Sequence, residues 1–156
     1  VLGTLVAGYW AMRKSKNKEA SSIFKMAVGT MIMGSGFFFM SAASNEFNNT
    51  GSSAMYWLVL AYLFHTIGEL CASPVALSFI TKLAPVKYAS LMMGLYFAMT
   101  GLGSKLAGKL GESASDYGEF AIFTGIAVFC VLFGLLILAF KNKLNALTHG
   151  AEEEAI

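Results

Sequence analysis

The sequence predicts an all-α, polytopic membrane helix bundle. Of its 156 residues, 56% are hydrophobic and only 13% are charged, whereas soluble domains carry about 25% charged residues. Several uncharged runs reach the roughly 20 residues that a helix needs to cross a bilayer. The runs lack the two-residue alternation of barrel strands, the other structure that satisfies its backbone in lipid. The small net charge of +2 argues against a nucleic-acid partner.

The apolar runs predict five helical segments along the chain. Residues 1–12 are apolar but about half as long as a crossing, so we expect the end of a truncated transmembrane helix. Residues 13–25 follow as a basic cytoplasmic loop and helix start. Complete transmembrane helices are expected at residues 26–44, 54–80, 88–110 and 120–140.

The charges between these runs predict the orientation of the bundle. Bases occupy the first loop, the third loop and the segment after the last run: Arg13, Lys14, Lys16, Lys18, Lys82, Lys87, Lys141 and Lys143. Acids occupy the second loop, residues 45–53, and the fourth loop: Glu46, Glu112, Asp116 and Glu119. Basic loops stay in the cytoplasm. The tail, residues 141–156, is therefore expected to be cytoplasmic.

Glu69 is the candidate functional residue, because it lies near the middle of the 54–80 run. Ionisable groups inside a membrane are costly and usually face a protein interior or a wet cavity. A turn of 100° per residue puts Tyr62, His65, Thr66 and Ser73 on the same face. This face predicts a cavity or a partner helix. The alternative is a structural carboxylate that pairs with a Lys or His of another helix.

Pro74 is expected to kink this helix just beyond Glu69, because it removes the hydrogen bond to the carbonyl of Leu70. A carboxylate, the Ser73 hydroxyl and a freed carbonyl suit an ammonium group or a proton. His65 precedes Glu69 by four residues, but no further ligand lies at a suitable depth, so we expect no metal site. We interpret His65 as a polar packing residue, with a role in proton handling as the alternative.

The 88–110 run has two different faces. One carries small residues at a spacing that lets helices pack closely, namely Gly94, Ala98, Gly101 and Gly108, together with Lys105. The opposite face, expected to line a pathway, carries Tyr96, Thr100, Gly103 and Ala107. Lys105 and Lys109 are expected to reach the membrane interface or to pair with Glu112, with an outer gate as the alternative. Residues 31–40 are interpreted as lipid-facing and packing surface.

Three blocks carry a resemblance to a known family: Gly-Glu-Leu-Cys-Ala-Ser-Pro at residues 68–74, Lys-Leu-Ala-Pro at 82–85 and Met-Met-Gly-Leu-Tyr-Phe at 92–97. With these blocks the sequence resembles the proton-dependent oligopeptide transporters of the major facilitator superfamily, which have twelve helices in two halves. The resemblance implies the C-terminal part of such a transporter, from the end of the eighth helix through the twelfth. It implies proton-coupled symport of di- and tripeptides across the inner (cytoplasmic) membrane. Protons are then the coupling ion, with no other cofactor and no catalytic residue.

The resemblance also implies the residues of a peptide site. Glu69 falls on the glutamate that receives the amino terminus of the peptide, and Ser73 lines the same pocket. Tyr96 stands where the family usually has a Trp that packs against the peptide. His65, Thr66, Tyr62 and Thr100 are expected to support this site. The partners implied are a di- or tripeptide, the lipid bilayer and the N-terminal helices, which would hold the peptide carboxylate and the main proton-coupling groups.

Two alternative functions remain at this point. One is transport of another substrate class by the same fold, such as nitrate or a drug-like compound, although a buried Glu69 argues against an anion. The other belongs to a different class, a non-transporting membrane enzyme or assembly subunit. The sequence shows no nucleophile–base pair or metal cluster that would support an enzyme.

Overall fold

The computed structural model describes residues 2–15 and 21–147, and it confirms the all-α class. Its long helices are α1 (Leu2–Ser15), α2 (Ser22–Thr50), α3 (Met55–Leu83), α4 (Ala89–Tyr117) and α5 (Glu119–Leu147). A short 3-10 helix, η1 (Val86–Tyr88), lies between α3 and α4. Among the described residues there is no β-strand.

The helices extend beyond the apolar runs, so the loops are shorter than the charges indicate. The expected loop at residues 45–53 is helical through Thr50, whose hydroxyl donates to the Glu46 carbonyl at 2.9 Å. Glu112 and Asp116, expected in a loop, lie within α4. The end of an apolar run indicates where a helix leaves the membrane. The backbone hydrogen bonds of the helix can continue beyond that point into water. The helix α2 ends at Thr50 and is capped by Gly51, whose φ of 71° suits glycine.

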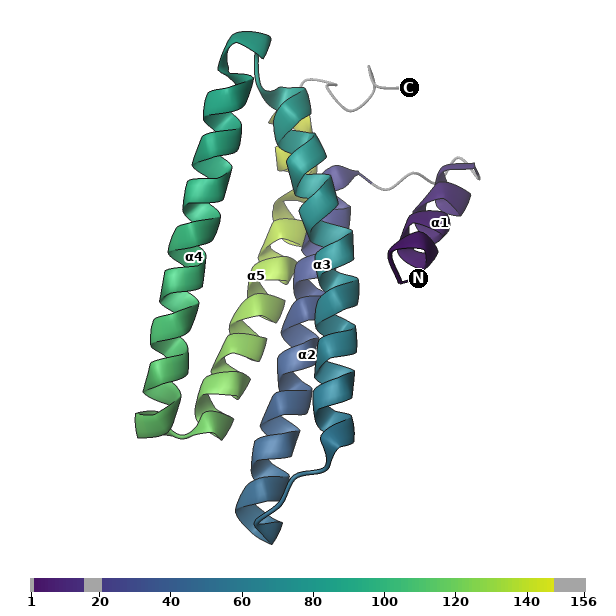
Figure 1. The fold of residues 1–156 in the computed structure, drawn as a ribbon. Helices are drawn as coiled ribbons and strands as arrows, with labels where there is room; N and C mark the ends of the chain where they lie inside the picture. The colour runs from purple at the N-terminus through teal and green to yellow at the C-terminus, as the bar shows by residue number, and fades with distance from the viewer. Residues whose placement is uncertain (1, 16–20, 148–156) are drawn as a thin grey trace.

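The helix α2 is the centre of the packed part of the molecule. It contacts both α3 and α5 extensively, whereas α3 and α5 make no contact with each other in the described chain. Figure 1 shows these three helices side by side, with α4 standing away from them and α1 beside α3. The helix α4 meets α3 at one end and α5 at the other. Its open position leaves much of its length without neighbours among the described residues.

Glycines bring α2 into close contact with its two neighbours. A Cβ atom at Gly29 would lie 2.7 Å from the Gly68 carbonyl oxygen of α3. On the other side, a Cβ atom at Gly34 would lie 2.6 Å from the Cβ of Cys130 in α5. Both distances are shorter than real Cβ contacts, so these positions require glycine. Part of the 31–40 segment is therefore packed against protein.

The small-residue face of α4 does not pack against the helices described here. A Cβ atom at Gly94, Gly101 or Gly108 would meet no described atom within 4 Å. The stripe therefore has no partner within this set of helices, and close packing against another helix stays a prediction. The physical reason is the position of α4, which contacts α3 and α5 only sparsely and does not contact α2 in the described residues. Glycine spacing indicates that a helix can be approached closely, and it does not say by which neighbour.

The two ends of the bundle differ in charge. The start of α2, the η1 turn and the end of α5 lie at one end, whereas the α2–α3 and α4–α5 links lie at the other (Figure 1). The first end carries bases such as Lys25, Lys87 and Lys141, and the second carries acids such as Glu46 and Glu119. In the described residues, α2, α3 and α5 are long and apolar enough to cross a membrane. The helix α4, with several charged residues in its second half, is not among these three.

Candidate functional site

The helix α3 carries Glu69 at its midpoint. The side of α3 that faces α2 is made of small residues, because Ala61, Gly68 and Cys71 are buried there. Glu69, Thr66 and Tyr62 are exposed on another side of the same helix. The predicted polar face therefore exists as one continuous strip, and it points away from the tight α2–α3 contact.

A groove of about 350 Å³ lies where this strip meets α2. The helix α2 contributes Phe37 and Met40 to its wall. The residues that line it from α3 are Leu58, Ala61, Tyr62, His65, Thr66 and Glu69. The structure thus brings together four of the predicted site residues: Glu69, Thr66, His65 and Tyr62.

The neighbours of His65 place it in the helix–helix contact. Its Nδ1 lies 2.7 Å from the Ala61 carbonyl oxygen, and its ring packs edge-on against Phe37 with centroids 4.6 Å apart. A Cβ atom at Gly36 would lie 2.7 Å from the same Nδ1. Contact on two sides holds the imidazole in one orientation, which fits the interpretation of His65 as a polar packing residue.

The polar groups around Glu69 leave its carboxylate available. The Thr66 hydroxyl donates to the Tyr62 carbonyl at 2.8 Å, a bond within the helix. In the described part of the chain, Glu69 has no hydrogen-bond or ion-pair partner. A carboxylate in apolar surroundings binds a cation through a charge-assisted hydrogen bond, which is stronger than a neutral one. The groove can therefore accept a positively charged group.

The other predicted site residues lie outside the groove. Ser73 is exposed one turn beyond Glu69 on α3, which continues as a helix through Pro74. Tyr96 is half-buried on α4, edge-on to Phe97 with ring centroids 5.6 Å apart. The Thr100 hydroxyl donates to the Tyr96 carbonyl at 2.9 Å. None of Ser73, Tyr96 and Thr100 lines the groove between α2 and α3.

Sequence reasoning missed the wall that α2 contributes. Phe37 and Met40 belong to the segment interpreted above as lipid-facing and packing surface, and both line the groove. A signal for this wall is present in Gly36, which allows the His65 ring to approach α2. A glycine in the middle of an apolar helix indicates a close neighbour, and the residues beside it share that contact.

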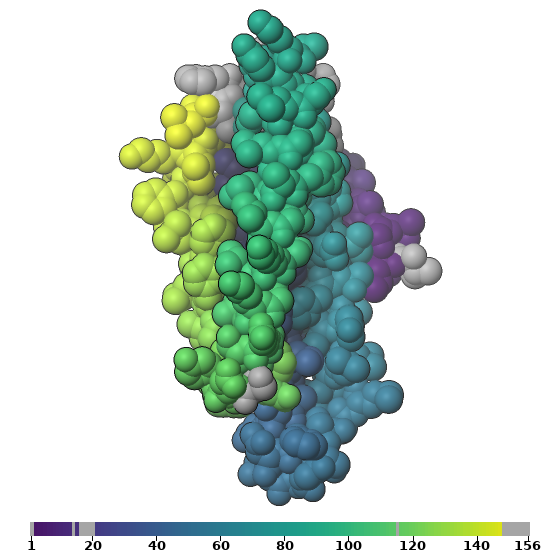
Figure 2. All heavy atoms as spheres, turned by 60° about the vertical axis from the view of Figure 1, so that its left-hand side comes forward, coloured from purple at the N-terminus to yellow at the C-terminus, as the bar shows by residue number. Residues whose placement is uncertain are grey.

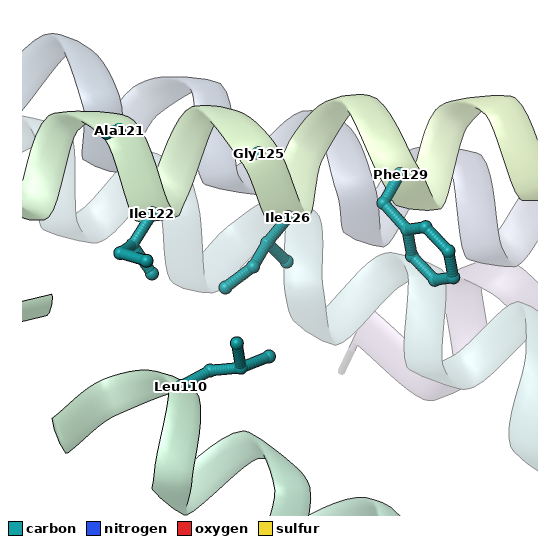
Figure 3. Close-up of a pocket in the computed structure, with 6 residues that line it drawn as sticks. All are labelled: Leu110, Ala121, Ile122, Gly125, Ile126 and Phe129. Atoms are coloured by element: carbon teal, nitrogen blue, oxygen red, sulfur yellow. The ribbon is translucent and has the colours of Figure 1, made fainter. Parts of the chain in front are cut away.

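A second hollow lies between α4 and α5, with a volume of about 320 Å³. Figure 3 shows Leu110 of α4 pointing toward Ile122 and Ile126 of α5, with Phe129 further along α5. All of its lining residues are apolar or glycine, so it offers no group for binding a charged ligand. Among the described residues, no three His, Cys, Asp or Glu side chains cluster as metal ligands would.

A bundle of long apolar helices indicates a polytopic membrane protein, and the carboxylate at the midpoint of one of them is a candidate functional group. Residues 2–123 match PTR2, the POT family, and the chain belongs to this family. The expected resemblance is thereby confirmed.

Two curated relatives are named for the peptides they transport. The "Peptide transporter YePEPT" of Yersinia enterocolitica subsp. palearctica serotype O:3 is 34% identical over 113 residues, covering 71% of this chain and 22% of that protein. The "Di-/tripeptide transporter" of Lactococcus lactis subsp. cremoris is 28% identical over 131 residues, covering 84% of this chain and 26% of that protein. The chain thus spans about a quarter of the length of these relatives.

A solved structure shares the arrangement of helices. The crystal structure of a mutant of "peptide transporter POT" superposes with a TM-score of 0.83 at 28% identity. The match covers 94% of this chain and 29% of that chain. The arrangement of the described helices is therefore found within a longer chain of that fold.

Proposed function

We propose that this chain forms part of the C-terminal half of a proton-coupled symporter of di- and tripeptides in the cytoplasmic membrane. The observation that carries the proposal is Glu69, a carboxylate at the midpoint of α3 that opens into a groove and has no partner among the described residues. The names of the curated relatives, which include peptide and di-/tripeptide transporters, support the same substrate class.

In this proposal the mechanism is binding and movement, with no covalent step and no cofactor other than protons. Glu69 binds the amino terminus of the peptide, and Tyr62 and Thr66 line the strip beside it. Ser73 extends the strip by one turn. The N-terminal helices hold the carboxylate of the peptide, and the two halves rock around a site near the membrane midplane. The basic end of the bundle faces the cytoplasm, and we propose the same side for the C-terminus.

Free and blocked amino termini test the substrate class. In the full-length protein, N-acetylated dipeptides are expected to compete with a labelled dipeptide at least roughly tenfold more weakly than the same dipeptides with a free amine, because acetylation removes the charge that Glu69 binds. The measurement is inhibition of labelled dipeptide uptake into proteoliposomes. Dipeptides with an amidated carboxyl terminus serve as the matched comparison, because they lose the charge at the opposite end of the peptide. Equal competition by free and N-acetylated dipeptides contradicts the role of Glu69 in binding the amine.

Tyr96 provides a test of the second wall of the site. If Tyr96 packs against a peptide side chain, Tyr96→Trp is expected to change the relative uptake of dipeptides with bulky and small side chains by about two- to fivefold, because the larger ring alters the space available. Uptake of a panel of Ala- and Phe-containing dipeptides measures this profile. Phe97→Trp, a change at its ring neighbour, is the control. An unchanged profile in Tyr96→Trp removes Tyr96 from the site.

A further inference from the structure

A third cavity lies between α1, α2 and α3, and it extends from the basic end of the bundle to the middle of α3. Its volume is about 530 Å³, larger than that of the groove at Glu69. Leu5 and Val6 of α1, Val28 and Ile32 of α2 and Ile67 of α3 form its apolar body. Among the described residues the backbone of α1 approaches that of α3 and stays farther from that of α2, so α1 encloses the space without filling it. Figures 1 and 2 both show α1 at the side of the bundle, away from α4.

Polar and cationic groups gather around this cavity. Arg13 lines it, with a guanidinium nitrogen 3.5 Å from the Tyr9 hydroxyl. Trp10 also lines it, and the buried Nε1 of its indole has no hydrogen-bond partner in the described chain. The Lys25 ammonium lies over the Trp10 ring, 5.4 Å from the centroid. The Lys141 ammonium of α5 lies 5.1 Å from the ring centroid of Phe24, another lining residue.

This combination restricts the chemistry of a ligand. The cationic side chains favour an anionic group, and the indole N–H requires an acceptor. A small anion alone would leave the apolar body of the cavity unfilled. A peptide would bring backbone polar groups against aliphatic walls that cannot satisfy them. An amphiphile with an anionic head and a hydrocarbon tail fits both parts.

We propose that the cavity between α1, α2 and α3 binds an anionic phospholipid, with one acyl chain among the aliphatic side chains and the headgroup phosphate beside Arg13 and Lys141. The bilayer supplies this ligand at high concentration. Basic pockets between transmembrane helices are known to suit such headgroups. Arg13, Lys25 and Lys141 all lie near helix ends. These positions agree with the depth of lipid headgroups at the membrane surface. The proposal does not depend on peptide transport.

Fluorescence of Trp10 tests the proposal in the full-length protein. The protein is reconstituted in nanodiscs that contain increasing fractions of brominated phosphatidylglycerol or of brominated phosphatidylcholine with the same acyl chains. The Trp10 signal is the difference between the native protein and Trp10→Phe. Brominated phosphatidylglycerol is expected to quench this signal at a several-fold lower mole fraction than brominated phosphatidylcholine.

Charge variants then locate the headgroup. Arg13→Gln and Lys141→Gln are each expected to raise the phosphatidylglycerol fraction needed for half-quenching about fivefold, the effect of one basic residue near an anionic headgroup. Lys143→Gln, an exposed lysine two residues further along α5, is the matched control and is expected to leave it unchanged.

Three results would overturn the proposal. Equal quenching by the two lipids would mean nonspecific contact with the bilayer. The absence of quenching by either lipid would mean that another segment of the protein fills the cavity. If soluble glycerol phosphate relieved the quenching by brominated phosphatidylglycerol as completely as unbrominated phosphatidylglycerol does, the cavity would be a site for a small anion.

Discussion

Replacing Glu69 by Gln is expected to weaken binding of a dipeptide with a free amino terminus by roughly 10- to 100-fold. Hydrogen bonds that involve a charged group contribute about 1.5–3 kcal/mol, and an amide keeps the shape of the side chain while losing its charge. The effect is expected to be large because no other acidic residue of the described chain lines the groove and could bind the amine instead. Peptide binding to the purified full-length protein, measured by isothermal titration calorimetry, separates this effect from proton coupling.

Two further variants make this result specific. Glu69→Asp keeps the charge on a shorter side chain and is expected to retain more affinity than Glu69→Gln. Glu119→Gln makes the same chemical change at the exposed start of α5 and is expected to bind peptide normally. Normal peptide affinity in Glu69→Gln would show that the Glu69 carboxylate does not bind the peptide. An equal loss of affinity in Glu69→Gln and Glu119→Gln would indicate a general effect of charge.

Gly68→Ala is expected to lower the stability of the folded bundle by roughly 1–3 kcal/mol, the usual cost of overpacking a tight contact. The new Cβ would lie 2.6 Å from the Gly29 carbonyl oxygen and 2.7 Å from the Met33 backbone nitrogen. Backbone atoms cannot move aside as a side chain does, so α2 and α3 have to separate. Because Gly68 immediately precedes Glu69, the separation also displaces the carboxylate, and peptide affinity is expected to fall as well. Thermal unfolding in detergent measures the first effect.

A double-mutant cycle tests the cause of this loss. Gly29→Ala opens the same crossing from α2, where its Cβ would lie 2.7 Å from the Gly68 carbonyl oxygen. If both substitutions act by separating the two helices, the double variant is expected to lose clearly less than the sum of the single losses. Additive losses would indicate two independent local defects. Unchanged or raised stability in Gly68→Ala would show that the crossing is looser than the structure indicates.

The sequence predicts best the residues whose side chains do not suit their surroundings, such as a charged group within an apolar run. A carboxylate is too costly in a lipid-facing position, so the depth of Glu69 in its apolar run is enough to indicate a candidate face, whose function stays a prediction. The helical period then places Tyr62, His65 and Thr66 beside it, and the structure brings all four residues to one groove. The number and order of the helices follow from the length of the apolar runs in the same way.

Features that depend on which helices are neighbours could not be predicted. The Gly29–Gly68 and Gly34–Cys130 contacts join segments distant in sequence, and no local pattern says which glycine meets which helix. The stripe at Gly94, Gly101 and Gly108 looks the same in sequence and meets nothing among the described residues. Ser73 and Tyr96 are assigned by resemblance to a family, and their contribution to one site with Glu69 stays a prediction.

The single residue between α4 and α5 determines how α4 can move. Gly118 alone connects Tyr117 to Glu119, with a φ of 86° that glycine adopts without strain. Consecutive Cα atoms are about 3.8 Å apart, so the adjoining ends of the two helices cannot draw apart and α4 cannot slide along its axis past α5. The other end of α4 is joined to α3 through residues 84–88 and contacts α3 there. Both ends of α4 are therefore held by short links, and the freedom that remains to it is to bend between them.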